Sequence, residues 1–591
     1  MVRAQENDLA KMTYPELVGV CRDIRNKLID YFSSHGGHVA TNLGAVELVV
    51  SALKEYAFEG DSFLFDIGNQ AYALKLLTRR ELPFDSIRTL GGQSGFQAKA
   101  ENPRDLTIGG HAGVALAYAV GLLRSLDRKP QPDTGPHNVL CFIGDASLAE
   151  GCALEALNAV MPSKGARLVL VVNDNRWGID PTTGSLSRIL LSPDDAKLFF
   201  ALHGLDYVHC SDGNDLSSLQ EAWATVKRTR NNIVLHAHTH KGAGLPVAEA
   251  EPTRFHYQPP FDPHTGQVKD AETRLRYVDL NSEILLALKR EGHDVVVIAT
   301  NMCAGNGLEA FRRECPADYL DVGICEQLAV AMSCGVALAG RTPVIAMHCS
   351  FLPRAFDQVF HDVCLQGNHV VLLGARHGLN GPDGPSHHAM FDLSYLRCLP
   401  NLAIYAPRDL GDYAAAVRHA VVRERGPILV LSPHRFEPRP KSAPTDGDLA
   451  PLDVMATGDD ALVVCTGSMC EEGRRVRELL AARGASVGLV HVRRVKPFDA
   501  QAFGEIARRH RLVAVLEENS RIGGIGSEIA SLLAAGCPCP EILQCGAPDE
   551  FIPHGDIPGL RDLAGLSAAT IAPRIEQRLA ALARRRSSQP C

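Results

Sequence analysis

The chain has 591 residues, of which 46% are hydrophobic and 22% charged, and its formal net charge is -8. Because this length exceeds what one hydrophobic core usually supports, we expect about three domains. The negative charge excludes an electrostatic footprint for nucleic acid or for an anionic membrane surface. No uncharged run of about eighteen apolar residues occurs, which excludes a membrane-spanning helix.

The N-terminal stretch and the cysteines indicate in which cellular compartment the protein is expected. The stretch MVRAQENDLAKMTYPEL lacks the apolar core of a signal peptide, so none is expected. The 17 cysteines include no C-x-x-C pair and no zinc-type spacing. We therefore expect reduced thiols in a cytoplasmic enzyme.

Apolar runs that resemble strands alternate with amphipathic helical stretches for most of the length. The runs lie at 138–145, 166–174, 232–238, 294–300, 342–350, 369–375, 427–432, 460–468, 485–493 and 512–518. This alternation predicts βαβ units, in which parallel strands are joined by crossover helices.

Two polar, proline-rich segments interrupt the alternation, at 248–274 and at 433–453. They divide the chain into three predicted α/β domains, spanning 1–275, 276–445 and 446–591. Each domain is expected to contain a mainly parallel sheet flanked by helices.

The run that ends at Val172 leads directly into Asn173-Asp174-Asn175. One interpretation is an Asx turn, since Asn and Asp side chains hydrogen-bond their own backbone. The other is a ligand site, because ligands collect at the carboxyl ends of parallel strands. An earlier run ends in Asp145, about thirty residues before Asn175, which is the length of one crossover between neighbouring strands.

Carboxylate and amide oxygens such as those of Asp145 and Asn175 are hard ligands that suit magnesium. The small residues Ala146 and Ser147 follow Asp145. They would let backbone N–H groups approach phosphate oxygens at the start of a helix. The residues therefore favour a magnesium ion that also holds a diphosphate.

The spacing of Gly-Asp-x and Asn-Asp-Asn resembles the signature of thiamine-diphosphate enzymes. Longer blocks narrow the resemblance to the transketolase-like group and, within it, to the 1-deoxy-D-xylulose-5-phosphate synthase family, over nearly the whole chain. These blocks lie at 38–48, 66–80, 109–122, 254–266, 321–330, 350–366, 375–398 and 517–528. The resemblance implies three transketolase-like domains and the cofactors thiamine diphosphate and Mg²⁺. It also implies decarboxylation of pyruvate and condensation of the two-carbon unit with an aldehyde such as glyceraldehyde 3-phosphate.

The resemblance also assigns roles to particular residues. The metal ligands would be Asp145, Asn175 and the backbone carbonyl of Trp177. The cofactor would contact Asn69, Gly110, His111, Ala112, Ala146, Ser147, Asn175, Lys241, Phe351 and Glu326. The catalytic groups would be Glu326, His38, His256, His387 and Asp383.

Glu326 matches the family glutamate that hydrogen-bonds the pyrimidine ring and activates it. The alternative is a solvated acid at the end of a strand. The preceding residues Val322 to Cys325 are small or apolar. An unpaired carboxylate among them would be costly, which favours the functional interpretation.

The acceptor aldehyde would be bound, by the same resemblance, by His348, Arg354, Arg376, Asp383, His387 and Arg435. Arginine suits a phosphosugar because its planar guanidinium bonds two phosphate oxygens at once. Surface arginines with no ligand are the alternative.

Several positions depart from the family pattern. Asn69 replaces a histidine, Ala146 a glycine, Leu328 a histidine and His348 a tyrosine, and Ala112 lies where the family has serine. The stretch His209-Cys210-Ser211-Asp212-Gly213-Asn214-Asp215 stands in place of the family's GPxDGHD.

These departures leave other functions open, since a few pocket contacts decide which substrate is accepted. Within the same class of enzyme, the chain could transfer a ketol unit as transketolase does, or it could use a different, unphosphorylated aldehyde. Another open function is that of a non-catalytic relative that binds the cofactor only.

The family further implies a homodimer in which both cofactor-binding domains of one site come from the same chain. The apolar, Gly/Ala-rich segments 110–123 and 332–347 would allow helices to approach closely across an interface. Ordinary packing of helices on a sheet within one domain is the alternative interpretation.

Overall fold

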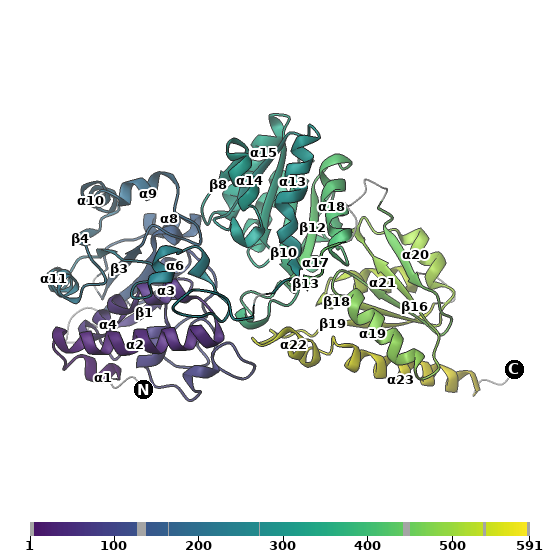
Figure 1. Ribbon diagram of the computed structural model, residues 1–591, viewed down its shortest axis with the longest axis horizontal. Coiled ribbons are helices and arrows are strands. Elements are labelled where there is room, and N and C mark those ends of the chain that lie inside the picture. The colour runs from purple at the N-terminus through teal and green to yellow at the C-terminus, as the bar shows by residue number, and fades with distance from the viewer. Residues whose placement is uncertain are drawn as a thin grey trace. The chain divides into compact units, whose positions relative to one another are not determined.

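The computed structural model describes residues 5–126, 137–163, 165–270, 272–440, 449–535 and 539–587. The chain forms two compact units (Figure 1). Unit 1 comprises Met1–Ala271 with Asp321–Cys325, and unit 2 comprises Glu272–Leu320 with Glu326–Cys591.

Unit 1 is built on a parallel five-stranded sheet with the strand order β1-β2-β3-β5-β4. The strands are β1 (Ser62–Phe65), β2 (His137–Gly144), β3 (Ala166–Asp174), β4 (Asp206–Cys210) and β5 (Ile233–His238). Every residue of β3 is buried, as expected for a central strand covered on both faces.

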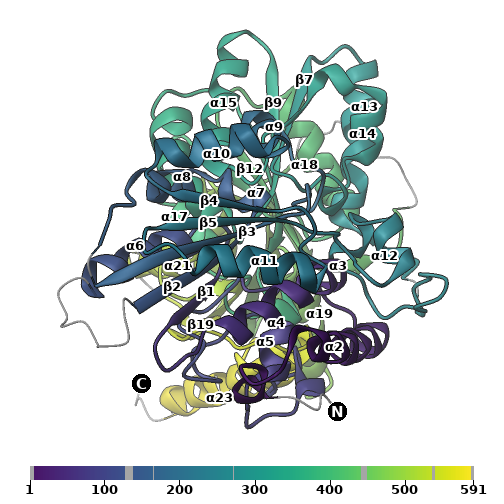
Figure 2. The same cartoon turned by 90° about the vertical axis from the view of Figure 1, so that its left-hand side faces the viewer.

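Helices cover both faces of this sheet. Figure 2 shows α8 (Gly151–Asn158) and α10 (Pro193–Leu202) on one side, with α4 (Val46–Glu55) and α11 (Leu216–Val226) on the other. Their apolar residues form two separate core clusters. The other helices of unit 1 are α1 (Glu6–Leu9), α2 (Tyr14–His35), α3 (Val39–Gly44), α5 (Tyr72–Leu77), η1 (Phe84–Ser86), α6 (Ala115–Leu126), α7 (Asp145–Leu148), α9 (Gly184–Leu190), α12 (Pro246–Ala250) and η2 (Arg254–His256).

Unit 2 contains two large sheets. The first has the order β17-β11-β12-β10-β9-β7-β8, in which β17 pairs antiparallel with β11. Its strands are β7 (Val295–Ala299), β8 (Tyr319–Asp321), β9 (Thr342–His348), β10 (Val371–His377), β11 (Ala403–Tyr405), β12 (Ile428–Pro433) and β17 (Arg494–Lys496).

The second sheet of unit 2 has the order β14-β16-β15-β18-β19, with only β14 antiparallel. Its strands are β14 (Leu452–Ala456), β15 (Ala461–Cys465), β16 (Val487–Val492), β18 (Leu512–Ser520) and β19 (Glu541–Ala547). The mainly parallel α/β architecture expected from the sequence is therefore confirmed. The edge strand β17 comes from beyond residue 445, so the two C-terminal segments share a sheet.

Unit 2 also contains a larger set of helices. They are η3 (Tyr277–Leu280), α13 (Asn281–Arg290), η4 (Ala304–Asn306), α14 (Glu309–Glu314), η5 (Pro316–Asp318), α15 (Glu326–Leu338), η6 (Leu352–Ala355), α16 (Phe356–Gln358), η7 (Val359–Cys364), η8 (Gly381–Asp383), α17 (Asp392–Leu396), α18 (Leu410–Val422), α19 (Met469–Ala481), α20 (Ala500–Ala507), α21 (Ile525–Ala534), α22 (Ile557–Leu563) and α23 (Ala568–Ser587). Among the described residues, no helix is both long and apolar enough to cross a membrane.

The proline-rich segment at 248–274 is packed for much of its length. Phe255 and Phe261 are fully buried in the core of unit 1 and their rings meet edge to face. At its end, β6 (Leu275–Arg276) pairs antiparallel with β13 (Phe436–Glu437) within unit 2. The second segment at 433–453 includes residues 441–448, which lie outside the described residues. Domain boundaries near 275 and 445 stay predictions.

Asp66 joins the end of β1 to the start of α6. Its carboxylate accepts hydrogen bonds from the backbone N–H groups of Gly113, Val114 and Ala115, at 2.9, 3.0 and 3.0 Å. These N–H groups have no partner within α6, so the carboxylate caps the helix. This cap fixes the loop in front of α6, which carries His111.

We expect Asp66→Asn to destabilise unit 1 by about 1–3 kcal/mol, because a side-chain amide turns one acceptor oxygen into an NH₂ donor that faces backbone N–H groups. Thermal unfolding followed by circular dichroism measures the change. Asp30→Asn, on the exposed face of α2, is the matched control. Equal unfolding temperatures for the two variants would contradict the capping role.

Candidate active site

The carboxyl edge of the unit 1 sheet brings the first group of predicted residues together. Gly144 of β2 is in register with Asn173 of β3, and Asp174 is in register with His238 of β5. Asp145 follows Gly144, so it lies beside the end of β3. The expectation that neighbouring strands carry Asp145 and the Asn-Asp-Asn sequence is confirmed.

The three polar residues that end β3 have different partners. Asn173 donates to Gln70 Oε1 at 3.1 Å and accepts from Thr239 Oγ1 at 2.5 Å, so it ties the sheet to two neighbouring segments. Asp174 lies 2.9 Å from His236 Nε2. The Oδ1 atom of Asn175 accepts the N–H of Trp177 at 3.0 Å, which is an Asx turn. The turn leaves a second lone pair on that oxygen for a ligand.

Asp145 is the first residue of α7 and is 5% exposed. Burial, together with the neighbouring carboxylate of Asp174, raises the pKa of Asp145 well above its ordinary value. A buried acid in this setting is stabilised by a cation. Asp145, Asn175 and the Trp177 carbonyl offer the oxygen ligands that Mg²⁺ prefers, so these residues fit the predicted metal.

Lys241 lies close to this group. Its Nζ atom donates to the carbonyl of Gly178 at 2.6 Å and lies 3.3 Å from His256 Nδ1. Burial lowers the pKa of Lys241 to about 7, against the opposing effect of Asp145 and Asp180. The two carboxylates therefore do not fully balance the charge of the Lys241 ammonium group, as expected where an anion is to bind.

His38 and His256 form the third part of the unit 1 group. Their rings are 5.4 Å apart and perpendicular, and the ring of Tyr257 lies 5.4 Å from His38. Arg88 Nη2 is 2.8 Å from His38 Nδ1. Neither residue was predicted from the sequence: Tyr257 lies within the block 254–266 but was assigned no role, and Arg88 lies outside all of the matching blocks.

The remaining predicted cofactor contacts of unit 1 lie in two adjoining loops and on α7. Gly110 donates to the carbonyl of Ile67 at 2.6 Å, and the Asn69 carbonyl accepts from Asn42 Nδ2 at 2.6 Å. These bonds place the loop with His111 and Ala112 next to the loop with Asn69. On α7, the Ser147 hydroxyl hydrogen-bonds Asp66, so only its backbone is available to a ligand.

The second group of predicted residues lies in unit 2. Glu326 is the first residue of α15 and is 2% exposed, which confirms the expected burial. Its Oε2 atom is 3.6 Å from Arg354 Nε, within an ion pair but beyond a hydrogen bond. Glu326 and Arg354, predicted for the cofactor and the acceptor, are thus neighbours.

Phe351 lies between two histidines of the predicted acceptor group. Its ring is parallel to that of His348, with centroids 6.2 Å apart, and perpendicular to that of His387, at 5.6 Å. His348 Nε2 is buried and has no hydrogen-bond partner within the described part of the chain. Burial, with Arg376 next in importance, lowers the pKa of His348 well below its usual value.

Arg376 and Asp383 form an ion pair of 3.6 Å at the end of β10. Arg376 has a φ of 59°, and the pairing of β10 with β12 shifts register at this point. His434 follows β12, and burial and Arg376 lower its pKa to about 3. Arg435 pairs with Glu437 at 2.7 Å, so a ligand would have to compete for its guanidinium. His434 is a neighbour that sequence reasoning missed.

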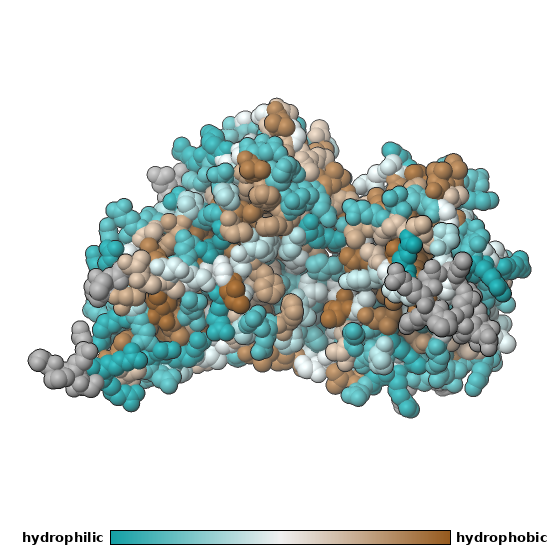
Figure 3. All heavy atoms as spheres, turned by 180° about the vertical axis from the view of Figure 1, so that it is seen from behind, coloured by the Kyte–Doolittle hydropathy of each residue, from teal (hydrophilic) through white to brown (hydrophobic). Residues whose placement is uncertain are grey.

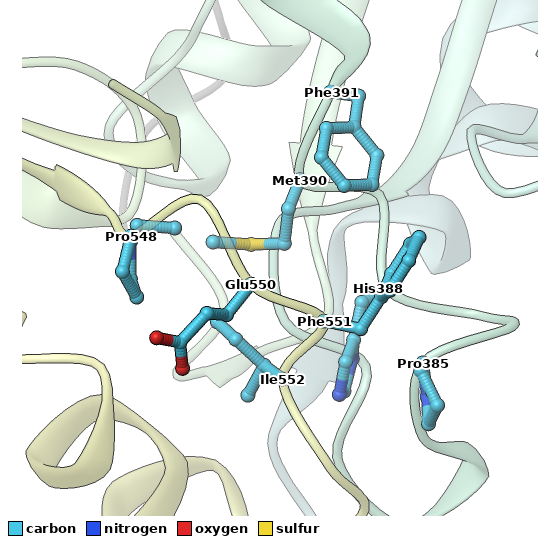
Figure 4. A pocket seen from close by; sticks show the side chains of 9 residues that line it. Pro385, His388, Met390, Phe391, Pro548, Glu550, Phe551 and Ile552 are labelled. Atoms are coloured by element: carbon cyan, nitrogen blue, oxygen red, sulfur yellow. The ribbon is translucent and has the colours of Figure 1, made fainter. Parts of the chain in front are cut away.

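A pocket in unit 2 is lined by Pro385, His388, Met390, Phe391, Ala547, Pro548, Glu550, Phe551 and Ile552 (Figure 4). None of the predicted site residues lines it. His388 Nε2 lies 2.9 Å from the carbonyl of Pro553, and the rings of Phe391 and Phe551 are 6.2 Å apart. These contacts brace the loop that carries Asp383 and His387.

Comparison with known proteins identifies three matching family models. Residues 2–197 match the family described as 1-deoxy-D-xylulose-5-phosphate synthase. Residues 274–436 match the pyrimidine binding domain of transketolase, and residues 452–571 match its C-terminal domain.

Similar curated proteins extend over nearly the whole chain. A 1-deoxy-D-xylulose-5-phosphate synthase of Acidobacterium capsulatum is 33% identical, with 95% of each chain covered. The enzyme of the same name from Heliobacterium modesticaldum is 34% identical over 98% of this chain and 95% of its own. A solved transketolase of Pichia stipitis is 16% identical over 94% and 96% of the two chains, with a TM-score of 0.46.

We expect the affinity of the protein for magnesium pyrophosphate to fall as the pH rises through about 7. Lys241, whose pKa is about 7, is charged below that pH and neutral above it, and the charged form attracts the anion. Calorimetric titrations across this pH range measure the affinity. Because pyrophosphate itself titrates, the comparison is with Lys241→Gln, which should show a flatter profile. Lys197→Gln, at an exposed position of α10, should behave like the unchanged protein.

Proposed function

Because the chain belongs to the 1-deoxy-D-xylulose-5-phosphate synthase family, we propose that it is a carboligase dependent on thiamine diphosphate and Mg²⁺. It would decarboxylate pyruvate and condense the two-carbon unit with glyceraldehyde 3-phosphate to give 1-deoxy-D-xylulose 5-phosphate. The observation that carries the proposal is Glu326, a carboxylate that is 2% exposed at the first position of α15. When bound, thiamine diphosphate supplies the electron sink for decarboxylation.

The diphosphate end of the cofactor is assigned to unit 1. Asp145, Asn175 and the Trp177 carbonyl would hold the metal. Lys241 would contribute positive charge, since it is buried and only 2.6 Å from the carbonyl of Gly178, beside the metal group. The neighbouring loops with Asn69, Gly110, His111 and Ala112, and the backbone of Ala146 and Ser147, would line the rest of this end.

The pyrimidine end of the cofactor is assigned to Glu326 and Phe351 of unit 2. Glu326 would exchange a proton with the pyrimidine ring, as a positioned carboxylate does in general acid–base catalysis. Phe351 would pack on the ring face. His38 and His256 of unit 1, whose rings meet at 5.4 Å, would hydrogen-bond the reacting groups.

The acceptor is assigned to Arg354, Arg376, Asp383 and His387, with His348 and Arg435. Arg354 and Arg376 each form an ion pair of 3.6 Å with a carboxylate, and a guanidinium suits a phosphate because it can bond two oxygen atoms at once. Asp383 and His387 would bind the hydroxyl and carbonyl of the aldehyde. His348 is a neutral hydrogen-bonding group because its pKa is low.

The deciding experiment measures carbon dioxide release from pyruvate by the purified protein with cofactor and magnesium. Release should occur, and glyceraldehyde 3-phosphate should accelerate it. Glyceraldehyde, which lacks the phosphate of glyceraldehyde 3-phosphate, is the matched control acceptor. A stronger response to the unphosphorylated aldehyde, or turnover only with a ketose donor, would replace the proposed substrates. Absence of turnover with every 2-oxo acid and ketose, despite tight cofactor binding, would indicate a non-catalytic relative.

Glu326→Gln should lower the rate of pyruvate decarboxylation by about a hundredfold or more while leaving cofactor affinity nearly unchanged, because Gln keeps the shape but cannot transfer a proton. Glu309→Gln is the control, since Glu309 is also the first residue of a helix but is exposed. Decarboxylation and calorimetric binding are measured on both variants. A Glu326→Gln protein with full activity would remove Glu326 from the mechanism.

The proposed enzyme is a homodimer in the cytoplasm. The helix α15 exposes Leu328, Ala331, Gly335 and Leu338, spaced as one apolar stripe, and Leu338 is 78% exposed. On α6, Ala115 and Ala119 pack in the core while Tyr118 is 52% exposed. Hydrophobic side chains reach the surface in several places in Figure 3. Exposed apolar stripes support an interface between chains, and the described cysteines, all free thiols, support a reducing compartment.

Each site is proposed to be formed by one chain. Mixing Glu326→Ala with Asp145→Ala protein then yields no activity after subunit exchange, because every chain lacks one essential residue. Activity assays before and after exchange test this. Recovered activity would show that sites are shared between chains. A light-scattering mass equal to one chain at micromolar concentration would refute the dimer.

A further inference from the structure

Unit 1 contains a cluster of three histidines and one aspartate that the proposed reaction does not use. Asp174 ends β3, His236 and His238 lie on β5, and His209 lies on β4. Asp174 is in register with His238, and His209 with His236. Because alternate residues of a strand share a face and paired residues do too, all four side chains lie on the same face of the sheet.

The donor atoms of the cluster are close together. His236 Nε2 is 2.9 Å and His238 Nδ1 is 3.4 Å from the same oxygen, Asp174 Oδ2. One donor atom from each of these three residues lies within 4.8 Å of the others. Ligands about 2.0–2.1 Å from a tetrahedral metal are roughly 3.3 Å from one another, which the observed distances bracket.

His209 lies beside the other members of the cluster, outside the group of three residues whose donor atoms are within 4.8 Å of one another. Its ring centroid lies 5.0 Å from that of His238 and 5.9 Å from that of His236. The Nε2 atom of His209 is buried and has no hydrogen-bond partner within the described ranges. His209 also begins the stretch that stands in place of the family's GPxDGHD, so it belongs to a part of the chain that departs from the family pattern.

We propose that Asp174, His236 and His238 bind a divalent transition metal ion such as Zn²⁺, with His209 as the fourth ligand. Imidazole nitrogen favours zinc and its neighbours over magnesium, whereas the predicted magnesium group of Asp145, Asn175 and Trp177 is made of oxygen atoms. The two sites differ in chemistry and share no ligand.

A hydrogen bond from outside the cluster orients His236 as a metal ligand. The hydroxyl of Tyr207 is 2.8 Å from His236 Nδ1, on the side of the ring away from Asp174. A partner on the second nitrogen orients the ring and fixes its tautomer, as in known metal sites. A hydrogen bond between His236 and Asp174 alone would account for their 2.9 Å contact. It would not explain why His238 Nδ1 lies 3.4 Å from the same oxygen, or why the buried His209 Nε2 has no hydrogen-bond partner within the described ranges.

The ion would act as a structural clamp. It would join the carboxyl ends of β3, β5 and β4, and Asp174 lies directly between Asn173 and Asn175. A metal there would hold in place the strand end that carries a predicted magnesium ligand. Binding therefore raises the stability of unit 1, since an ion bound only by the folded state stabilises that state.

The test uses the full chain, treated with a chelator and titrated with Co²⁺, which absorbs visible light when bound by nitrogen in a tetrahedral site. We expect one Co²⁺ per chain with such absorption, and a raised unfolding temperature. His238→Ala and His209→Ala should each weaken binding about tenfold or more, and Tyr207→Phe should weaken it about tenfold. His240→Ala, two residues beyond His238 and exposed, should bind as the unchanged protein does.

Two further variants distinguish this site from the predicted magnesium site. Asp145→Ala should keep Co²⁺ binding, and His238→Ala should keep binding of thiamine diphosphate with magnesium. Loss of Co²⁺ binding in Asp145→Ala with retention in His238→Ala would overturn the proposal, as would equal binding by His238→Ala and His240→Ala. Circular dichroism checks folding, and if His238→Ala fails to fold, His209→Ala and Tyr207→Phe decide the outcome.

Discussion

A carboxylate removed from water must gain hydrogen-bond donors or a cation, and this constraint shapes unit 1. Asp66 meets it with three backbone N–H groups at the start of α6. Asp174 meets it with two histidines. Burial raises the pKa of Asp66 as well as that of Asp145, but Asp145 has fewer donors and also faces the carboxylate of Asp174. The acid with the least compensation is therefore the one best placed to bind a metal ion.

Parallel sheets explain why these polar groups gather where they do. A strand covered by helices on both faces carries mainly apolar residues along its length, so most polar side chains appear near its ends. Asp145 and Asn175 follow β2 and β3 in unit 1, while His348, Arg376 and His434 lie at the ends of β9, β10 and β12 in unit 2. The same constraint thus produces both groups of predicted site residues.

The sequence predicted the long apolar strands and the residues attached to their ends, because burial on both faces leaves a clear pattern. It missed short strands such as β1 and β11, whose few residues show no periodicity. Arg88 lies fifty residues from His38, and only the fold brings the two together. The cluster of Asp174 with three histidines could not be predicted for a related reason. Its members come from three strands and have no fixed spacing in the sequence.

The proposed acceptor end depends on arginine for its positive charge. The pKa values of His348 and His434 are lowered by burial and by Arg376, so both rings are neutral near pH 7 and add no positive charge. Arg435 is paired with Glu437 at 2.7 Å. Arg354 and Arg376 form ion pairs of 3.6 Å with Glu326 and Asp383, and both guanidinium groups stay charged at any physiological pH. In the proposed acceptor site, preference for a phosphorylated aldehyde would therefore rest on these two arginines, whereas the neutral histidines would contribute shape and hydrogen bonds that an unphosphorylated aldehyde would use equally well.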